Sequence, residues 1–353
     1  MIKTGSIIGI IGGGQLGRMM AIAGAELGYK IHIFTPEHDS PASHVAYKTT
    51  VASYDDKEAL IKFAHEVSVI TFEFENIPYE SLALLEKEKS VFPSANILKI
   101  TCNRVQEKTF LNEIGIETAK FRKVTNFQEL QNAVKEIGLP AILKTCEMGY
   151  DGKGQATIKS DSDLLAIWQE INTQDAIVEG FVDFTIEISV IVARTSKDNS
   201  ECYIPVHNIH KNHILDTTIV PANISPDLAN EANNVAIKIA EKLDLRGLLA
   251  VEMFVTRDNK ILVNELAPRP HNSGHWTMDA AITSQFEQII RAVCGLPLGS
   301  TNMLCKAEMK NLIGEDVLDA DKYLKNKNAK LYLYGKSEIR AGRKMGHVNI
   351  LEF

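Results

Sequence analysis

The sequence predicts an α/β fold of several domains, and three observations carry this prediction. The chain has 353 residues, which suits two or three domains of roughly 100–200 residues each. The N-terminal part alternates short apolar runs with amphipathic stretches, as the strands and helices of a parallel sheet do. Two later apolar runs, 247–255 and 260–263, are joined by a short polar turn, which is typical of antiparallel strands.

Composition narrows the class of protein. The chain is 45% hydrophobic and 24% charged, as ordinary globular proteins are. Its net charge of −7 gives no general attraction to nucleic acid. Since no apolar run approaches the ~20 residues of a membrane-spanning helix, and a strand follows the first residues at once, we expect neither a membrane partner nor a signal peptide. The five scattered cysteines lack a C-x-x-C pattern, which favours reduced thiols in a cytoplasmic protein.

A glycine-rich turn follows the first apolar strand. Strand 6–11 runs into the segment 12–17, with sequence GGGQLG, and then into a helix. The backbone N–H groups of such a turn can face a phosphate at a helix N-terminus. An NAD site needs an acid where the second strand ends, but that strand ends at Thr35. We therefore favour a different phosphorylated ligand over NAD, and a purely structural turn stays open as the alternative.

Two acids follow the strand at 69–72. Glu73 and Glu75 would lie at the carboxyl ends of parallel strands, where such sheets bind ligands. A solvated strand end is an equally good interpretation of the same residues. A polar stretch after Pro93 marks a boundary, so the first domain is predicted to cover 1–98.

A second glycine-rich loop lies in the middle of the chain. The strand at 139–144 ends in Lys144, and the segment 149–155, with sequence GYDGKGQ, follows. A loop with several glycines and a lysine can fold its backbone N–H groups around a polyphosphate. The segment is not a Walker A motif, and a simple hairpin turn is the alternative. A helix at 101–115 precedes this region and carries Arg104.

Three further stretches suggest nucleotide contacts. The strand at 176–182 breaks at Glu179, and its backbone could pair with an adenine. Glu187 faces away from the isoleucines beside it, toward a ribose or toward solvent. Two histidines, at 207 and 210, are expected to follow a strand at 203–206. No third ligand completes a zinc set there, so we expect no transition metal.

Two carboxylates are expected to meet on one antiparallel pair of strands. Glu252 lies inside the apolar strand 247–255, where a lone carboxylate is costly unless it is paired or bound to a metal. Glu265 follows the neighbouring strand 260–263, across a turn at 257–259, so antiparallel pairing would place the two side by side. Because such carboxylates repel unless a cation lies between them, we predict Mg²⁺ or Mn²⁺ bridging them to nucleotide phosphates.

The densest polar segment is 264–276, with sequence NELAPRPHNSGHW. Asn264 and Glu265 supply oxygens for a hard cation, and an arginine, two histidines, an asparagine and a serine follow closely. Such polar content in so short a span predicts a site rather than a core. The tail 321–353 is basic, with eight Lys and Arg against three Asp and Glu. Its densest set could clamp a substrate phosphate: Lys336, Arg340, Arg343 and Lys344.

Together these motifs resemble the N5-carboxyaminoimidazole ribonucleotide synthetases, which are ATP-grasp enzymes of purine biosynthesis. The matching segments follow the family order and are 12–17, 149–155, 207–210, 264–276 and 342–347. The resemblance implies an α/β fold of the ATP-grasp (α+β) kind. A Rossmann-like domain would cover 1–98, an ATP-grasp domain of two subdomains 99–300 with a lid at about 120–182, and a small C-terminal β domain 301–353.

The resemblance also implies a ligase that forms a C–N bond with ATP hydrolysis. ATP, bicarbonate and 5-aminoimidazole ribonucleotide would give ADP, phosphate and N5-carboxyaminoimidazole ribonucleotide through carboxyphosphate, in de novo purine synthesis. A homodimer and an Mg²⁺ or Mn²⁺ ion are expected as in the family. The alternative is a formate-dependent glycinamide ribonucleotide transformylase or another ATP-grasp C–N ligase, but the RKMGH sequence at 343–347 argues against it.

The resemblance assigns roles to individual residues. The ATP site would comprise Arg104, Lys144, Gly149, Tyr150, Asp151, Gly152, Lys153, Gly154, Gln155, Glu179, Gly180, Phe181, Val182, Glu187, His210, Asn264 and Glu265. The second substrate would meet Gln15, Leu16, Glu73, Asn272, Ser273, Lys336 and Arg343. The catalytic residues would be Asp151, Lys153, Arg269 and His271, and the metal ligands Glu252 and Glu265. His271 is either an acid–base group or a positioning hydrogen-bond partner.

The chain departs from the family pattern in two places. Met148 stands where the family usually has a glycine, and 145–147 stand where it often has an arginine. The sequence ends at Phe353, earlier than the pattern suggests, so we expect a closing helix to be missing.

Overall fold

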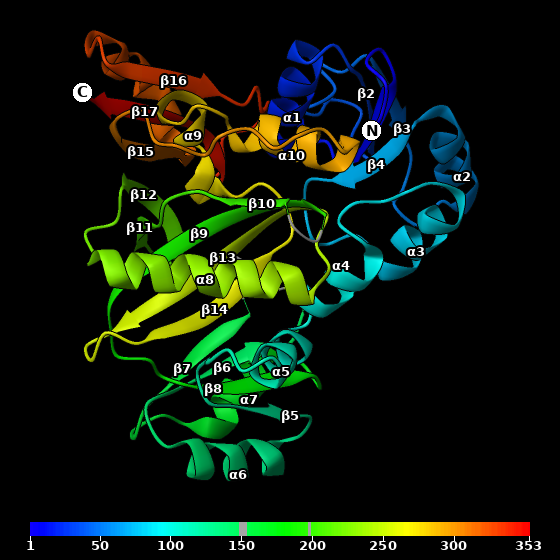
Figure 1. The fold of residues 1–353 in the computed structure, drawn as a ribbon. Coiled ribbons are helices and arrows are strands. Elements are labelled where there is room, and N and C mark those ends of the chain that lie inside the picture. Colours follow the sequence, from blue (N-terminus) through cyan, green and yellow to red (C-terminus); the bar gives the residue numbers. More distant parts are fainter. Residues whose placement is uncertain (148–153, 197–198) are drawn as a thin grey trace.

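A computed structural model of the chain describes residues 1–147, 154–196 and 199–353. Within these residues three β-sheets are surrounded by helices (Figure 1). The N-terminal sheet, drawn in blue, lies beside the large green-to-red sheet, and the small sheet lies at the opposite end of the molecule. None of the helices that the structure describes is long and apolar enough to cross a membrane.

The N-terminal sheet is parallel, with strand order β3-β2-β1-β4. Its strands are β1 (Ile7–Ile11), β2 (Lys30–Thr35), β3 (Lys48–Val51) and β4 (Val69–Phe72), and its helices are α1 (Gln15–Glu26), α2 (Lys57–Glu66) and α3 (Tyr79–Glu88). The residues of β4 are all buried, as strands covered by helices on both faces are. The predicted strand–helix–strand opening is therefore confirmed, with the glycine-rich turn between β1 and α1.

Two short helices, α4 (Ala95–Thr101) and α5 (Arg104–Glu113), connect this sheet to the rest of the chain. The sequence predicted one helix starting at Thr101, and this start was wrong. Thr101 ends α4, because its hydroxyl donates back to the carbonyl of Ile97 at 3.1 Å. The side chain of Asn103 instead caps α5 by accepting hydrogen bonds from the backbone N–H groups of Val105 and Gln106, as N-cap residues do.

The small sheet is antiparallel, with order β5-β8-β6-β7, and has its own apolar core. It comprises β5 (Phe121–Val124), β6 (Ala141–Thr145), β7 (Gln155–Ile158) and β8 (Ala176–Gly180), with α6 (Phe127–Ile137) and α7 (Leu164–Ile171). Its extent resembles the lid predicted at about 120–182. The predicted loop residues Gly149, Tyr150, Asp151, Gly152 and Lys153 lie outside the described residues.

The large sheet has nine strands in the order β14-β13-β9-β11-β12-β15-β17-β16, with β10 paired to β9. The strands are β9 (Phe184–Ser196), β10 (Asn199–Cys202), β11 (Val206–Lys211), β12 (Ile214–Val220), β13 (Gly247–Thr256), β14 (Ile261–Ala267), β15 (Lys306–Ile313), β16 (Ala329–Leu333) and β17 (Lys344–Glu352). Helix α8 (Pro226–Lys242) packs across β9 and β13 (Figure 1). The last three strands continue this sheet through the pairing of β12 with β15.

The remaining helices follow β14, and one of them packs against both the N-terminal domain and the large sheet. They are η1 (Asn272–Gly274), α9 (Thr277–Ala280), α10 (Gln285–Cys294) and η2 (Gly314–Lys325). Helix α10 packs against α1, and one apolar core contains side chains of both, such as Met20 and Ile290. This shared core fixes the basic tail and the glycine-rich turn relative to the large sheet.

The predicted strand at 203–206 was wrong. Strand β11 begins at Val206 and contains both His207 and His210, which pair with Ile219 and Leu215 of β12. A polar strand was hard to predict because its middle residue, Asn208, is buried and forms hydrogen bonds to neighbouring strands rather than apolar contacts.

Candidate active site

A cavity of about 480 Å³ lies between the small sheet and the large sheet, with α5 at its edge. It gathers predicted residues from distant parts of the sequence. Those that line it are Arg104, Lys144, Gln155, Phe181, Glu187, His210, Glu252, Asn264, Glu265, Arg269, His271 and Asn272. Many of the predicted nucleotide residues therefore share one cavity with the predicted catalytic residues Arg269 and His271.

Lys144 at the end of β6 belongs to a buried ion-pair cluster. Its Nζ lies 2.8 Å from Oε2 of Glu179, and Nζ of Lys108 lies 3.4 Å from Oε1 of the same carboxylate. Burial raises the pKa of Glu179, but the two lysines outweigh this effect and lower it to about 2. The carboxylate is thus engaged by the two lysines, and the backbone of Glu179 lies in β8, paired between β5 and β6.

Glu187 and His210 lie on neighbouring strands at the predicted ribose end of the cavity. Nδ1 of His210 lies 2.5 Å from Oε2 of Glu187. Burial lowers the pKa of His210, but the hydrogen bond that it donates to Glu187 raises the pKa above its ordinary value. The second carboxylate oxygen of Glu187 can accept from a sugar hydroxyl.

Glu252 and Glu265 are directly opposite each other on β13 and β14, as the sequence predicted. Oε2 of Glu265 lies 3.4 Å from a guanidinium nitrogen of Arg104, and Oε1 of Glu252 lies 3.0 Å from Nε2 of His271. Among the described residues no group of three or more His, Cys, Asp or Glu could hold a metal ion. Two adjacent carboxylates nevertheless fit Mg²⁺, because this ion usually takes one or two carboxylates and completes its shell with water and substrate phosphates.

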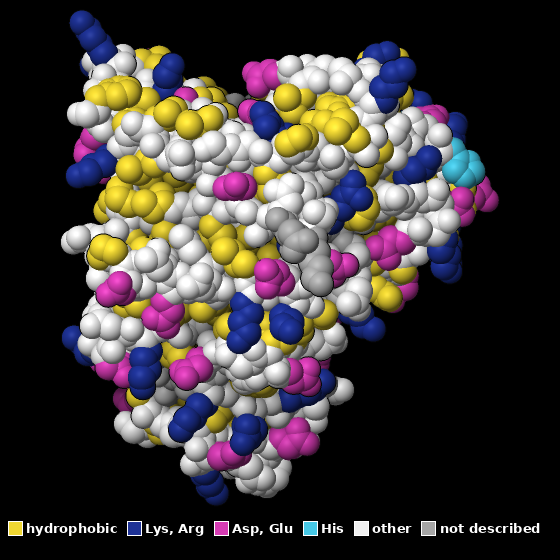
Figure 2. All heavy atoms as spheres, in the orientation of Figure 1, with side chains coloured by type: hydrophobic (Ala, Val, Ile, Leu, Met, Phe, Trp, Pro, Cys, Tyr) yellow, Lys and Arg dark blue, Asp and Glu magenta, His cyan; other side chains and the backbone are white. Residues whose placement is uncertain are grey.

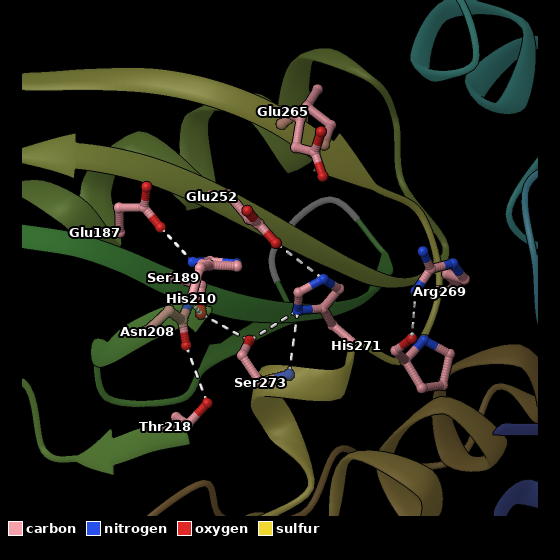
Figure 3. A network of polar contacts seen from close by, with 12 residues as sticks. Glu187, Ser189, Asn208, His210, Thr218, Glu252, Glu265, Arg269, His271 and Ser273 are labelled. Atoms are coloured by element: carbon pink, nitrogen blue, oxygen red, sulfur yellow. Dashed lines mark hydrogen bonds and ion pairs between the residues drawn. The ribbon is translucent and has the colours of Figure 1, made fainter. Parts of the chain in front are cut away.

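His271 is held on both sides of its ring (Figure 3). Its Nδ1 lies 2.8 Å from Oγ of Ser273 and accepts the backbone N–H of Ser273 at 3.3 Å. Burial raises the pKa of Glu252, but the hydrogen bond from His271 outweighs this effect and holds that pKa below its ordinary value. Gln285 clamps the backbone of His271 through its N–H and its carbonyl, at 2.8 and 2.7 Å.

Arg269 is held by Glu75, one of the two acids that the sequence placed at a strand end where such sheets bind ligands. One of its guanidinium nitrogens lies 2.9 Å from Oε1 of Glu75, and another donates to the carbonyl of Pro270 at 3.0 Å. Glu75 also lines the cavity. The ion pair fixes the planar guanidinium at the cavity wall, where it can bind an anion.

Glu73 caps the glycine-rich turn rather than lining the cavity. Its carboxylate accepts the N–H of Gly14 at 2.6 Å and that of Gly17 at 3.1 Å. A Cβ at position 14 would lie 2.5 Å from Oε1 of Glu73, which explains the glycine. Burial raises the pKa of Glu73 even though these two hydrogen bonds lower it. Glu73 does not engage the N–H groups of Gln15 and Leu16, which lie between the two that it holds.

The basic tail approaches the glycine-rich turn. Lys336 and Glu73 each shift the pKa of the other, so residues far apart in sequence are close in space. Burial and the positive charge of Arg343 lower the pKa of Lys336 to about 8. Nζ of Lys336 donates to the carbonyl of Lys344 at 2.7 Å, and Arg343 donates to the carbonyl of Glu338.

Not every predicted residue lines the cavity, and some lining residues had no assigned role. Outside the lining are Gln15, Leu16, Glu73, Gly154, Glu179, Gly180, Val182, Ser273, Lys336 and Arg343. Glu107 lines the cavity and accepts the N–H of Leu266, and Lys108 donates to the carbonyl of Asn264. Both follow Arg104 by three and four residues on α5, and this helical spacing would have found them. Lys344, which the sequence placed in the phosphate-clamping set of the tail, also lines the cavity.

Family models match the chain in three consecutive parts. A ribonucleotide synthetase preATP-grasp domain matches residues 5–102, an ATP-grasp domain matches 109–286, and a phosphoribosylaminoimidazole carboxylase C-terminal domain matches 307–352. These ranges follow the order of the N-terminal sheet, the two central sheets and the last three strands.

Two curated relatives are similar over nearly all of this chain. The chain is 47% identical to the N5-carboxyaminoimidazole ribonucleotide synthase of Bacillus subtilis, over 100% of this chain and 93% of that protein. It is 48% identical to the bifunctional purine synthesis protein purC/E of Dictyostelium discoideum, over 99% of this chain. The chain spans only 37% of the length of that longer protein.

Solved structures of the same kind have the same fold. An ADP complex of N5-carboxyaminoimidazole ribonucleotide synthetase is 46% identical, with a TM-score of 0.97 over 100% of this chain and 94% of that one. The Aspergillus clavatus enzyme in complex with ADP and 5-aminoimidazole ribonucleotide is 28% identical, with a TM-score of 0.93 over 99% and 94%. With these similarities and the three matching family models, the chain belongs to the N5-carboxyaminoimidazole ribonucleotide synthase family of ATP-grasp enzymes.

Proposed function

We propose that this chain carboxylates 5-aminoimidazole ribonucleotide to N5-carboxyaminoimidazole ribonucleotide with ATP and bicarbonate, in de novo purine synthesis. The supporting observation is that one cavity is lined both by predicted nucleotide residues and by Arg269 and His271. Glu252 lines the same cavity and pairs with His271. This arrangement lets ATP and the second substrate bind next to each other, beside the two carboxylates proposed to hold the metal. The proposal includes Mg²⁺ or Mn²⁺ held by Glu252 and Glu265.

The first step transfers a phosphoryl group. An oxygen of bicarbonate attacks the γ-phosphorus of ATP, the bond to the β–γ bridging oxygen breaks, and ADP and carboxyphosphate result. Such transfer depends on charge neutralisation and positioning more than on covalent chemistry by the protein. Arg104 and Lys144 contribute positive charge from the cavity wall, and a bound Mg²⁺ would neutralise phosphate charge.

The second step forms the C–N bond. The exocyclic amine attacks the carboxyl carbon of carboxyphosphate, or CO₂ released from it, phosphate leaves, and the amine loses one proton. Arg269 is suited to hold the anionic carboxyl-bearing group at the cavity wall. Both ring nitrogens of His271 are already engaged, by Ser273 and Glu252, which favours a positioning role for His271 over an acid–base role.

The second substrate would extend from the cavity toward the N-terminal domain. We assign its 5′-phosphate to the N–H groups of Gln15 and Leu16 together with Lys336 and Arg343. The turn keeps its shape because Glu73 caps it, and the helix N-terminus favours an anion. The predicted cover of the nucleotide by the 149–155 segment, which would exclude water from the labile carboxyphosphate, falls largely outside the described residues. Asp151 and Lys153 of that loop stay predictions.

An ADP-release assay with each substrate omitted in turn tests this function. We expect release to require ATP, bicarbonate and 5-aminoimidazole ribonucleotide together, and formate not to replace bicarbonate. Release that ignores the ribonucleotide would refute the proposal. Formate-dependent release with glycinamide ribonucleotide would identify the transformylase alternative.

We also propose that the protein is a cytoplasmic homodimer. Ile22 on α1, together with Ile282 and Leu304 near α9, exposes 42 to 60% of its surface. Figure 2 shows apolar side chains gathering over this upper part of the molecule. The free state of all five cysteines supports a reducing compartment. Light scattering of the purified chain tests the dimer, and a monomeric mass at micromolar concentration would contradict it.

A further inference from the structure

A buried chain of polar side chains runs across the large sheet to His271. Glu252 on β13 is directly opposite Ser189 on β9, and Asn208 on β11 is directly opposite Thr218 on β12. Residues opposite each other in an antiparallel pair point to the same face of the sheet. The three polar side chains beyond Glu252 are at most 4% exposed, and Figure 3 shows them converging on Ser273 of η1.

Four hydrogen bonds connect these side chains to the ring of His271. Thr218 donates to the amide oxygen of Asn208 at 3.1 Å, and the amide nitrogen of Asn208 donates to Oγ of Ser189 at 2.9 Å. Oγ of Ser189 lies 2.7 Å from Oγ of Ser273. Oγ of Ser273 in turn lies 2.8 Å from Nδ1 of His271.

One direction of donation satisfies every group along this chain, starting from the backbone N–H of Ser273 that points at Nδ1 of His271. Ser189 accepts from Asn208, so its own hydroxyl hydrogen is available for Ser273. Ser273 then accepts from Ser189 and donates to Nδ1 of His271. The backbone N–H of Ser273, which can only donate, also points at Nδ1. Nδ1 is therefore unprotonated, and the ring proton lies on Nε2, facing Oε1 of Glu252 at 3.0 Å.

We propose that Ser189, Asn208 and Thr218 form, with Ser273, a positioning relay that holds His271 in the Nε2–H tautomer and thereby orients Glu252. If the proton were on Nδ1 instead, Nδ1–H would point at the backbone N–H of Ser273, so two donors would oppose each other. The lone pair of Nε2 would then face the carboxylate of Glu252. Hydrogen bonds behind a metal ligand fix its orientation and tune its affinity. The proposal rests on the proposed function for the role of Glu252 as a metal ligand, but the tautomer does not depend on it.

Tight packing keeps the relay and the histidine in place. Ser273 is fully buried, so the substrate contact predicted for it is replaced by contacts to His271 and Ser189. A Cβ at position 274 would lie 2.3 Å from Cδ1 of Ile191 and 2.6 Å from Oε1 of Gln285. Glycine at this position therefore allows η1 to approach both the sheet and the clamp on His271.

The test uses the full chain labelled with ¹⁵N-histidine, observed by long-range ¹H–¹⁵N correlation at about pH 8, above the ordinary histidine pKa of about 6.5. The signals of His271 are those that disappear in His271→Gln. We expect the wild-type ring to be protonated on Nε2 alone. In Ser189→Ala the hydroxyl of Ser273 loses its donor and can accept from Nδ1–H, so this tautomer should become partly populated against the remaining backbone N–H of Ser273. A smaller change is expected for Thr218→Val, because it removes only the far end of the relay.

Metal binding supplies a second readout that needs no turnover. Mn²⁺ affinity of the ADP complex should fall about tenfold in Ser189→Ala, at the low end of the usual effect of such changes. The KM for 5-aminoimidazole ribonucleotide should stay within about twofold, while kcat falls in proportion to the metal affinity. The matched control is Thr217→Val, a buried threonine next to Thr218 on β12 whose hydroxyl contacts Asp216 instead. Thr217→Val should match the wild type in the tautomer of His271, in Mn²⁺ affinity and in kcat and KM.

The outcomes separate the relay from the proposed function. A wild-type ring protonated on Nδ1 refutes the relay, as does a Ser189→Ala protein with wild-type ring signals, even if its activity is lost. If Ser189→Ala does not fold, the same decision rests on Thr218→Val and Ser273→Ala. A wild-type protein that lacks carboxylating activity but shows the Nε2–H ring and the expected shift in Ser189→Ala supports the relay and refutes the function.

Discussion

Nζ of Lys144 lies 2.8 Å from Oε2 of Glu179, and both side chains are largely withdrawn from solvent between β6 and β8. The same carboxylate also holds Lys108 of α5. The small sheet and α5 are therefore joined by one buried acid. Removing one partner of a buried ion pair leaves an uncompensated charge and is strongly destabilising.

We expect Glu179→Gln to lower the free energy of unfolding by about 3–5 kcal/mol, the usual cost of breaking a buried ion pair. Urea unfolding followed by circular dichroism measures this change. The control is Glu136→Gln, because Glu136 pairs with Arg122 at an exposed site, where ion pairs contribute little to stability. Equal effects of the two substitutions would contradict the buried pair.

The carboxylate of Glu179 also makes the free energy of unfolding depend on pH. The pKa of Glu179 is lowered from 4.5 to about 2, so the unfolded state binds more protons between these values. The stabilisation is fully present above pH 4.5 and is lost as pH falls toward 2. Unfolding experiments across this window should show a steeper loss of stability in the wild type than in Glu179→Gln. Parallel curves would show that Glu179 does not titrate as described.

The paired acids on β13 and β14 lead to a prediction on metal dependence. We expect Glu265→Gln to raise the Mg²⁺ concentration for half-maximal ADP release by about 10–100-fold, as disturbances of metal sites do. The exposed Glu308 on β15 supplies a control, Glu308→Gln, which should leave the requirement unchanged. Calorimetric titration of Mn²⁺ into the ADP complex provides an independent check. Wild-type metal affinity in Glu265→Gln would refute the site.

The lowered pKa of Lys336 leads to a prediction of how substrate binding depends on pH. Burial and Arg343 lower the pKa of Lys336 to about 8, so the side chain loses its positive charge above that pH. A ribonucleotide phosphate is a dianion above about pH 6. The KM for 5-aminoimidazole ribonucleotide should therefore be lowest between these values and rise above pH 8. Lys336→Arg should remove the alkaline rise, and an unchanged profile would exclude Lys336 as the phosphate partner.

Glu73 predicts a combined effect on stability and substrate binding. In Glu73→Ala the N–H groups of Gly14 and Gly17 lose their acceptor, and an unsatisfied buried donor costs about 1–3 kcal/mol. We expect a lower melting temperature and a higher KM for 5-aminoimidazole ribonucleotide, with the KM for ATP unchanged. The exposed Glu80 in the first turn of α3 provides the control Glu80→Ala. A raised KM for ATP alone would contradict this assignment.

The motifs alone were enough to predict the family and the fold class, and the comparisons confirm both. They succeeded because short segments such as 264–276 combine residue types that only a binding site requires. The antiparallel facing of Glu252 and Glu265 was also predictable, since a strand, a short turn and a second strand determine their register. The roles of the individual site residues stay predictions.

Other features depended on contacts that no local pattern encodes. Whether Glu73 binds a substrate or caps α1 depends on the distance between β4 and the glycine-rich turn. The start of α5 depended on which of two candidate residues caps it. The hydroxyl of Thr101 bonds back to the preceding helix, so Asn103 is the N-cap. Glu75 and Glu107 acquired partners in Arg269 and Leu266 only through folding.

The sequence by itself determined the chemistry of this protein, because glycine turns, strand-end acids and the basic tail are local patterns of residue type and spacing. The tertiary structure alone decided which of these groups are available to a ligand. Glu179 and Ser273 were predicted to contact ligands, yet both side chains are buried and engaged by other residues. The physical reason is that a buried polar group must find a partner, and the identity of that partner depends on how distant strands pack together.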